Sequence, residues 1–332
     1  MRSGLFTVFT LALLLPVAAS AQALGGIGGD TSSVFTISVN PQYPLPHSQA
    51  TLSFLSSSLD LSNSTLKVSV GGKNIYQGSV QPVSITLGSA GAVANVTTEL
   101  SSGGTKYTQS LSIQPQDVVL IAEPISSSPV LYPGKPRIPL EGDVRVVAMA
   151  NLRSASGKAL SPSALSYSWT VDSTRIANSS GIGKSTVIVA SPLQYRVRDV
   201  SVAVVSQDGS LVGGASLSLM PQEPSVRIYE NDPLLGIRYD RALGGNYAIR
   251  GAEATLFAAP FSLPTTNGSP FIQWFLGGAT AQTGSLITLR PAGSGEGIAS
   301  LSLTASAGSN AIATAILSLT FGATKGTNFF GL

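Results

Sequence analysis

Few side chains in this chain are of the types that carry out catalysis. The sequence has one histidine, His47, and no cysteine. His47 stands alone in a Pro-Leu-Pro-His-Ser segment, whereas nucleophilic catalysis needs a base beside a hydroxyl or a thiol. Zinc sites need clustered His and Cys ligands, which this composition does not supply. We therefore expect no catalytic residue and no cofactor, and a protein that is not an enzyme.

Acidic residues gather at one place in the last third of the sequence. Glu230 and Asp232 lie in a Tyr-Glu-Asn-Asp-Pro stretch, and Asp240 follows shortly after. Calcium takes 6–8 oxygen ligands, which carboxylates between two β-rich segments can supply. Asn and Asp side chains also stabilise turns, which explains the same residues without a metal. We expect no bound metal and keep these three carboxylates as the candidates for calcium.

Aromatic residues give a second kind of candidate binding site. Tyr229, Tyr239 and Tyr247 lie in a long, loop-like stretch before the first clear strand that follows it, so we consider them as a surface patch. We favour the other interpretation, in which these are aromatic residues on edge strands. Phe329 and Phe330 end a Gly/Thr-rich tail, which is either a docking peptide or a frayed terminus.

Trp169 and Trp274 occupy equivalent places in two stretches with one plan. Each follows a short apolar strand and precedes a Gly-marked turn, and a third copy around Val70 lacks the Trp. Exposed tryptophans stack on sugars, but a residue repeated at one structural position usually fills a core. We therefore predict that both tryptophans are core residues.

The elements that must position these residues are β-strands. Helical periodicity is nearly absent after the N-terminal segment, whereas apolar and polar residues alternate with the period of two that is typical of sandwich strands. Turn signals recur at intervals of about 8–12 residues. The clearest alternating runs are residues 35–39, 51–55, 66–70, 200–204 and 301–304, and residues 311–321 also read as a strand.

The alternating strands repeat with a long period. Three closing hairpins end near Ile113, Leu219 and Leu319, about 100 residues apart, which marks tandem domains because solenoid repeats are shorter. Short Pro-containing linkers follow, and they restrict bending, so we expect the domains to form a stiff, elongated chain. The predicted domains are residues 34–115, 116–222 and 223–322.

Both ends of the sequence differ from these domains. Residues 1–21 read as a secretory signal peptide, with Arg2, an apolar run over 5–19 and a small-x-small cleavage site at 19–21. The run spans about 22 Å as a helix, which is short of the roughly 30 Å bilayer core, and a retained anchor is the alternative. A Gly-rich lead (22–33) follows, and a flexible tail (323–332) ends the sequence. We expect no membrane span after signal removal.

Composition narrows the class of partner. Only 11% of residues are charged and the formal net charge is +3, so we expect no nucleic acid partner. Without cysteine no disulfide forms, and each domain of about 100 residues depends on its own apolar core. These features are typical of a bacterial exported protein that lies outside the cell, at the cell surface or in the periplasm.

The central Trp and the Gly-marked turn carry a resemblance. Tyr167-Ser168-Trp169 with residues 180–183, and Gln273-Trp274 with residues 283–284, resemble the PKD and Ig-like domains of bacterial exported surface proteins. The resemblance covers residues 115–322 and is weaker over 30–114. It implies an all-β chain of three tandem Ig-like (PKD-like) antiparallel β-sandwiches.

These expectations lead to one function and one alternative. We expect a non-enzymatic surface or envelope protein that serves as a structural spacer or an adhesion stalk, with other surface or envelope proteins as partners. The alternative is a carbohydrate-binding protein that uses aromatic patches on the second and third domains, with glycans as partners.

Overall fold

The computed structural model describes residues 34–322, apart from 131, 133, 293–295 and 309. The predicted signal peptide, the lead and the tail with Phe329 and Phe330 lie outside the described residues. The described chain consists of β-strands and loops, with three single-turn 3-10 helices: η1 (Leu61–Asn63), η2 (Pro162–Ala164) and η3 (Ala177–Ser179). None of the helices in this part of the chain has the length and apolarity to cross a bilayer. The predicted all-β class is confirmed.

The first β-sandwich contains one sheet of three strands and one of four. The order is β1-β2-β5 in one sheet and β4-β3-β6-β7 in the other. The strands are β1 (Thr36–Asn40), β2 (Gln49–Leu55), β3 (Thr65–Val70), β4 (Lys73–Ser79), β5 (Val83–Thr86), β6 (Ala94–Ser102) and β7 (Thr105–Ile113). Alternate residues of both sheets are buried, among them Leu52 and Phe54 in β2 and Leu66 and Val68 in β3.

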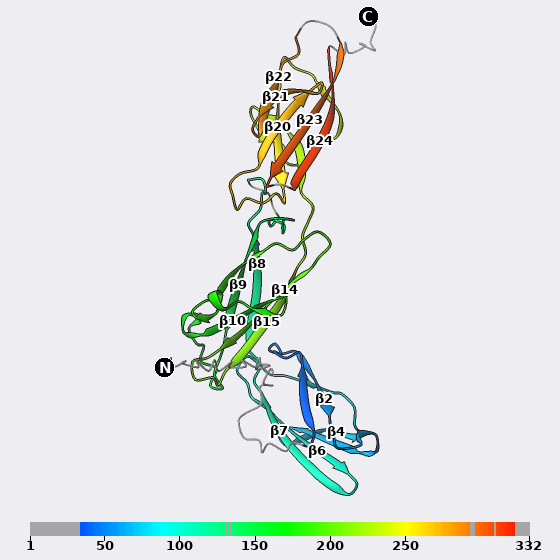
Figure 1. The fold of residues 1–332 in the computed structure, drawn as a ribbon, viewed down its shortest axis with the longest axis vertical. Helices are drawn as coiled ribbons and strands as arrows, with labels where there is room; N and C mark the ends of the chain where they lie inside the picture. The colour runs from blue at the N-terminus through cyan, green and yellow to red at the C-terminus, as the bar shows by residue number, and fades with distance from the viewer. Residues whose placement is uncertain (1–33, 131, 133, 293–295, 309, 323–332) are drawn as a thin grey trace, which may run out of the picture. The chain divides into compact units, whose positions relative to one another are not determined.

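The second β-sandwich repeats this plan (Figure 1, green). The order is β13-β9-β8 in one sheet and β11-β10-β14-β15 in the other, where β12 also pairs with β10. The strands are β8 (Asp117–Pro124), β9 (Asp143–Asn151), β10 (Ser166–Val171), β11 (Thr174–Arg175), β12 (Gly181–Ile182), β13 (Thr186–Ala190), β14 (Arg198–Val205) and β15 (Val212–Leu219). One core cluster joins the two sheets, with Val144 and Val146 from β9 against Val200 and Val202 from β14.

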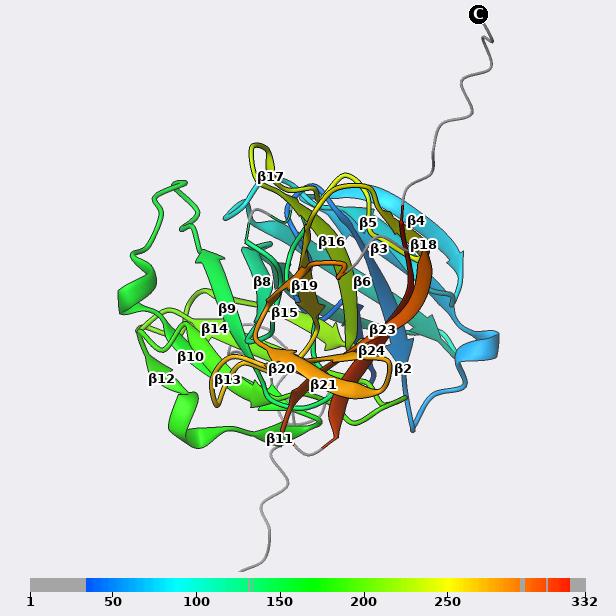
Figure 2. The same cartoon turned by 90° about the horizontal axis from the view of Figure 1, so that it is seen from above.

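The third β-sandwich has the most strands. Its sheets have the orders β17-β16-β19-β22 and β18-β24-β23-β20-β21. The strands are β16 (Ser225–Asp232), β17 (Gly236–Ile237), β18 (Gly245–Ile249), β19 (Ala254–Phe261), β20 (Phe271–Leu276), β21 (Ala279–Thr283), β22 (Leu286–Leu289), β23 (Gly297–Ala307) and β24 (Ala311–Phe321). Figure 2 shows β17 in a hairpin that leaves the body of its sheet. The strands from β16 onward bury one continuous core that includes Trp274.

The alternating runs of the sequence become strands as predicted. Four of the five runs lie wholly inside an observed strand, the run 35–39 overlaps β1 with one residue outside it, and residues 311–321 form β24. The three closing hairpins also form, as the antiparallel pairs β6/β7, β14/β15 and β23/β24. The three tandem sandwiches expected from the repeat are therefore present.

By its internal contacts the chain divides into two compact units. Among the described residues, the first comprises 34–42 with 49–86 and 93–113, and it holds the strands of the first sandwich. The second comprises 43–48, 87–92 and the chain from Gln114 onward, and it holds the second and third sandwiches.

Backbone hydrogen bonds link distant segments inside the second unit. The Ser127 N–H donates to the Leu263 carbonyl (2.7 Å), and the Ser262 N–H donates to the Ser127 carbonyl (3.1 Å). The Ser127 hydroxyl also accepts the Leu263 N–H at 3.1 Å. The connection after β8 is thus paired with the connection after β19.

Trp169 and Trp274 lie at equivalent positions in two cores. Both are 0% exposed. The indole N–H of Trp169, in β10, donates to the Lys184 carbonyl at 2.9 Å, just before β13 of the opposite sheet. The indole N–H of Trp274, in β20, donates to the Gly284 carbonyl at 2.9 Å, just before β22 of its opposite sheet. Each indole therefore connects the two sheets of its sandwich.

We predict that Trp274→Phe destabilises the third sandwich by about 1–3 kcal/mol, because the fully buried indole is lost together with its hydrogen bond to the Gly284 carbonyl. Urea unfolding followed by circular dichroism measures the change. Ile298→Thr, at a side chain that is 77% exposed, is the matched control and should change stability by less than about 0.5 kcal/mol.

The chain has only two tryptophans, so the variant leaves Trp169 as the single fluorescence reporter of the second core. The Trp169 transition should keep its midpoint. Equal stability of Trp274→Phe and Ile298→Thr would contradict the role given to the indole hydrogen bond.

Candidate functional site

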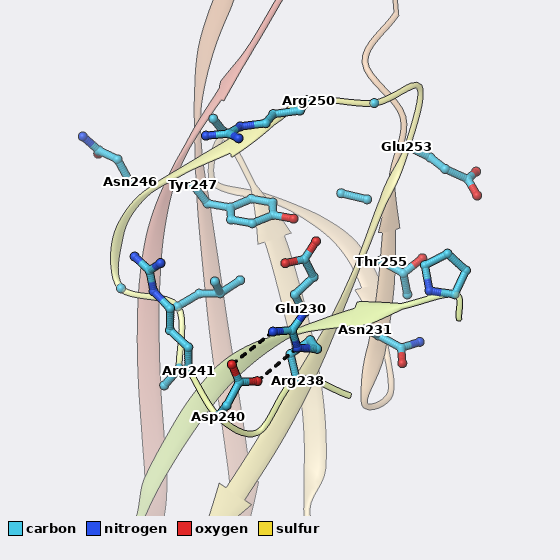
Figure 3. Close-up of a pocket in the computed structure, with 17 residues that line it drawn as sticks. Glu230, Asn231, Arg238, Asp240, Arg241, Asn246, Tyr247, Arg250, Glu253 and Thr255 are labelled. Carbon is cyan, nitrogen blue, oxygen red and sulfur yellow. Dashed lines mark hydrogen bonds and ion pairs between the residues drawn. The ribbon is translucent and has the colours of Figure 1, made fainter. Parts of the chain in front are cut away.

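The long connection from β16 to β19 in the third sandwich encloses a cavity. Its volume is about 770 Å³, within the range of about 300–1,000 Å³ that small-ligand sites occupy. Figure 3 shows the lining side chains. Six of the lining residues are charged, in a chain where 11% of residues are charged: Glu230, Arg238, Asp240, Arg241, Arg250 and Glu253. Asn231, Asn246, Tyr247 and Thr255 add uncharged polar groups.

A hairpin starts this connection. The Asp232 carboxylate accepts the backbone N–H groups of Leu234 (2.8 Å) and Leu235 (2.9 Å). These bonds close the turn between β16 and β17, and Gly236 supplies the positive φ of 73° that the turn needs. Because the same backbone bonds stabilise the charged form, they lower the pKa of Asp232.

The connection then crosses from one sheet to the other. The Leu243 N–H donates to the Ile228 carbonyl at 2.7 Å, which keeps the returning chain beside β16. Gly245 has φ of 69°, and from there β18 runs parallel to β24, with Tyr247 opposite Leu319. The crossing leaves the space between β16 and β18 that forms the cavity.

Glu230 and Tyr247 meet inside the cavity. Val226, Ile228 and Glu230 alternate on one face of β16, and the first two are buried in the core. Glu230 is the last of this series and lies below the Tyr247 ring in Figure 3. Burial of the phenol, then the charge of Glu230 and a hydrogen bond with its side chain, raise the pKa of Tyr247 to about 12. Tyr247 is therefore a neutral phenol at physiological pH.

The other carboxylates of the cavity are paired with arginines. Arg238 and Asp240 form a two-pronged ion pair with both N–O distances at 3.1 Å. Hydrogen bonds with Arg238 lower the pKa of Asp240. Glu253 pairs with Arg290 at 2.8 Å. No ion pair between the described residues involves Arg241 or Arg250, which line the cavity on either side of the β18 segment.

The predicted aromatic patch is divided between two places. The loop-like interpretation holds for Tyr239, which lies in a turn, and is wrong for Tyr229, on β16, and Tyr247, on β18. Tyr229 is 5% exposed and packs edge-to-face on Tyr239, with ring centroids 5.2 Å apart. Tyr239 in turn packs on Phe257 at 6.3 Å. Tyr229 and Tyr239 thus belong to a packed aromatic cluster, whereas Tyr247 faces the cavity.

The three calcium candidates have different partners in the structure. Asp232 accepts turn amides, Asp240 pairs with Arg238, and Glu230 faces Tyr247. Within the described chain, no group of three or more His, Asp or Glu residues is placed to hold a metal ion. The structure brings Glu230 and Asp240 to the lining of the cavity, which the sequence analysis did not predict.

Sequence reasoning missed the arginines of this site. Arg238, Arg241 and Arg250 fall within one short stretch of a weakly charged chain, and this local enrichment was the available signal. Asn246 and Glu253 had no comparable signal: the pairing of β18 with β24 brings Asn246 to the cavity, and Glu253 lies directly before β19.

No protein-family model and no curated protein matches the chain. Solved structures that are similar include three N-terminal domains of the highly immunogenic outer capsid protein of bacteriophage RB49. That match has 13% identity and a TM-score of 0.23, and covers 88% of this chain and 100% of that one. A central fibronectin-III array of RIM-binding protein matches with 10% identity and a TM-score of 0.30, over 90% of this chain and 100% of that one.

A third similar structure is SGBP-B of the mixed-linkage glucan utilization locus of Bacteroides ovatus, in complex with a mixed-linkage heptasaccharide. It has 12% identity and a TM-score of 0.22, over 87% of this chain and 70% of that one.

We predict that Glu230→Gln lowers the pKa of Tyr247 from about 12 toward the usual value for tyrosine, because the negative charge that opposes phenolate formation is removed. The shift is partial, since burial is the largest cause and persists in the variant. NMR of ring-labelled tyrosine measures it, and Tyr247→Phe identifies the signal. An unchanged titration in Glu230→Gln would disprove the contact.

Proposed function

We propose that the chain is a non-enzymatic, exported surface or envelope protein that serves as a structural spacer or interaction stalk. Its partners are other surface or envelope proteins. The observation that carries this proposal is a series of self-contained sandwiches joined by short connections, with paired backbone at one of the junctions. Within the sandwich class, we assign the modules to the PKD-like type on the Tyr-Ser-Trp and Gly-turn pattern.

Independent cores support a load-bearing role. The second and third sandwiches each bury a core cluster that includes a fully buried Trp, and the chain has no cysteine to brace them. Each module of about 100 residues is large enough to fold on apolar burial alone. Modules that fold by themselves can be strung together without loss of stability, which suits a spacer.

The paired junction supports stiffness. Three features restrict motion at the connection between the second and third modules: the hydrogen bonds of Ser127 with residues 262–263, a bond from the Thr265 N–H to the Ile125 carbonyl (3.1 Å), and a bond from the Gln222 N–H to the Ile138 carbonyl (2.8 Å). In a linker without such contacts, these backbone groups would form hydrogen bonds with water. A spacer needs this restriction because a freely bending chain does not hold a fixed distance.

The alternative function, glycan binding by aromatic patches, finds less support in the packing. Tyr229 is buried, and Tyr239 packs edge-to-face with Tyr229 and with Phe257, so these two tyrosines belong to a packed cluster. Cross-linking on intact cells tests the leading proposal: capture of the chain in a larger surface assembly is expected, and a freely released monomer would contradict it.

We predict that Ser127→Ala loosens the junction, because the buried Leu263 N–H loses its side-chain acceptor. Amide hydrogen exchange at Leu263 should become about tenfold faster or more, which corresponds to about 1.4 kcal/mol. Ser128→Ala, at the adjacent position, is the control and should leave the rate unchanged.

The same variants can be compared by small-angle scattering. A compact chain of this length has a radius of gyration of about 20 Å, and a spacer must lie well above that value. A wild-type value near the compact limit would disprove the spacer.

A further inference from the structure

We propose that the cavity between β16 and β18 of the third sandwich binds an acidic saccharide, with a uronic-acid carboxylate held by Arg241 and Arg250 and sugar hydroxyls held by Glu230 and Tyr247. This inference goes beyond the spacer function and does not depend on it. The third module then serves as a recognition module.

The lining of the cavity indicates a hydrophilic ligand. Most small-ligand pockets are lined by apolar and aromatic side chains with a few polar groups. Here charged and amide groups dominate, and Leu243 and Pro233 are the largest apolar side chains among the lining residues. An apolar ligand would displace the water that is hydrogen-bonded to these groups and offer no hydrogen bonds in its place, so its burial here is unfavourable. The hydroxyl groups of a polyhydroxylated ligand can form those hydrogen bonds instead.

The charges of the cavity indicate an acidic ligand. Asp240 is paired with Arg238, and Glu253 with Arg290. Arg241 and Arg250 take part in no ion pair between described residues, so two guanidinium groups remain against the single carboxylate of Glu230. A guanidinium presents a fork of N–H donors that matches a carboxylate in two-pronged geometry. A ligand carboxylate therefore completes the charge balance.

Glu230 determines what else the ligand must carry. Its carboxylate accepts hydrogen bonds and repels a bare anion, so an acidic ligand must also bring donors to this side of the cavity. Tyr247, as a neutral phenol, both donates and accepts. A sugar ring with hydroxyls next to a carboxyl group supplies this combination, and Figure 3 shows Arg250, Tyr247 and Glu230 in succession across the cavity.

Titration of the full chain with trigalacturonate, followed by isothermal calorimetry, tests the proposal. We expect saturable binding that weakens with added sodium chloride, because the arginines are exposed to solvent. The fully methyl-esterified trisaccharide has the same hydroxyl pattern without the charges, and should bind at least about tenfold more weakly, since charge-assisted hydrogen bonds are lost.

Three variants locate the site. Arg241→Gln and Arg250→Gln should each weaken trigalacturonate binding about tenfold or more. Arg175→Gln removes an exposed arginine on β11, outside the cavity, and should bind as the wild type does. Unfolding curves of the variants should match the wild type, since the cavity arginines are exposed.

Three outcomes with the trisaccharides would overturn the proposal: equal binding of the acid and the ester, binding that survives both cavity variants, or no binding of trigalacturonate at all. Triglycine carries a carboxylate and an ammonium but no hydroxyls. Its binding in preference to the trisaccharide would assign the cavity to peptide termini and also overturn the proposal.

Discussion

The hydrogen bond between a buried indole and the opposite sheet is the interaction on which the second and third sandwiches depend. Trp169 and Trp274 lie on central strands, and each donates to a carbonyl at the start of a strand in the other sheet. The chain has no disulfide to connect its sheets. Burial of apolar side chains therefore stabilises the packing of the two sheets, and the hydrogen bond of the indole fixes their position relative to each other. The Gly-marked turns stand where the backbone must present that carbonyl.

A regular core leaves the connections between strands free to differ. The connection after the first strand illustrates this in the second and third sandwiches. After β8 it pairs through Ser127 with residues 262–263, and after β16 it forms a hairpin, crosses to the other sheet and encloses the cavity. The same place in the fold thus supplies a joint in one module and a polar cavity in the other.

Periodicity and repetition predicted the architecture because both are patterns of residue spacing along the sequence and do not depend on which strands pair. The alternation at residues 200–204 and 301–304 places one set of side chains in a core, whichever strands are its neighbours. The equivalent spacing of the two tryptophans predicted core positions, and both are fully buried. The cavity could not be predicted in this way. It depends on the parallel pairing of Tyr247 with Leu319, which joins residues far apart in sequence and follows a short, Gly-rich stretch that looks like a loop.

We place the proposed recognition site in the third module, between β16 and β18. Amide exchange in the presence and absence of trigalacturonate, followed by mass spectrometry, tests it directly. We expect slower exchange in residues 230–255 and no change in residues 117–151, which contain the equivalent strands of the second sandwich. Equal protection of both regions, or protection confined to the second sandwich, would contradict it.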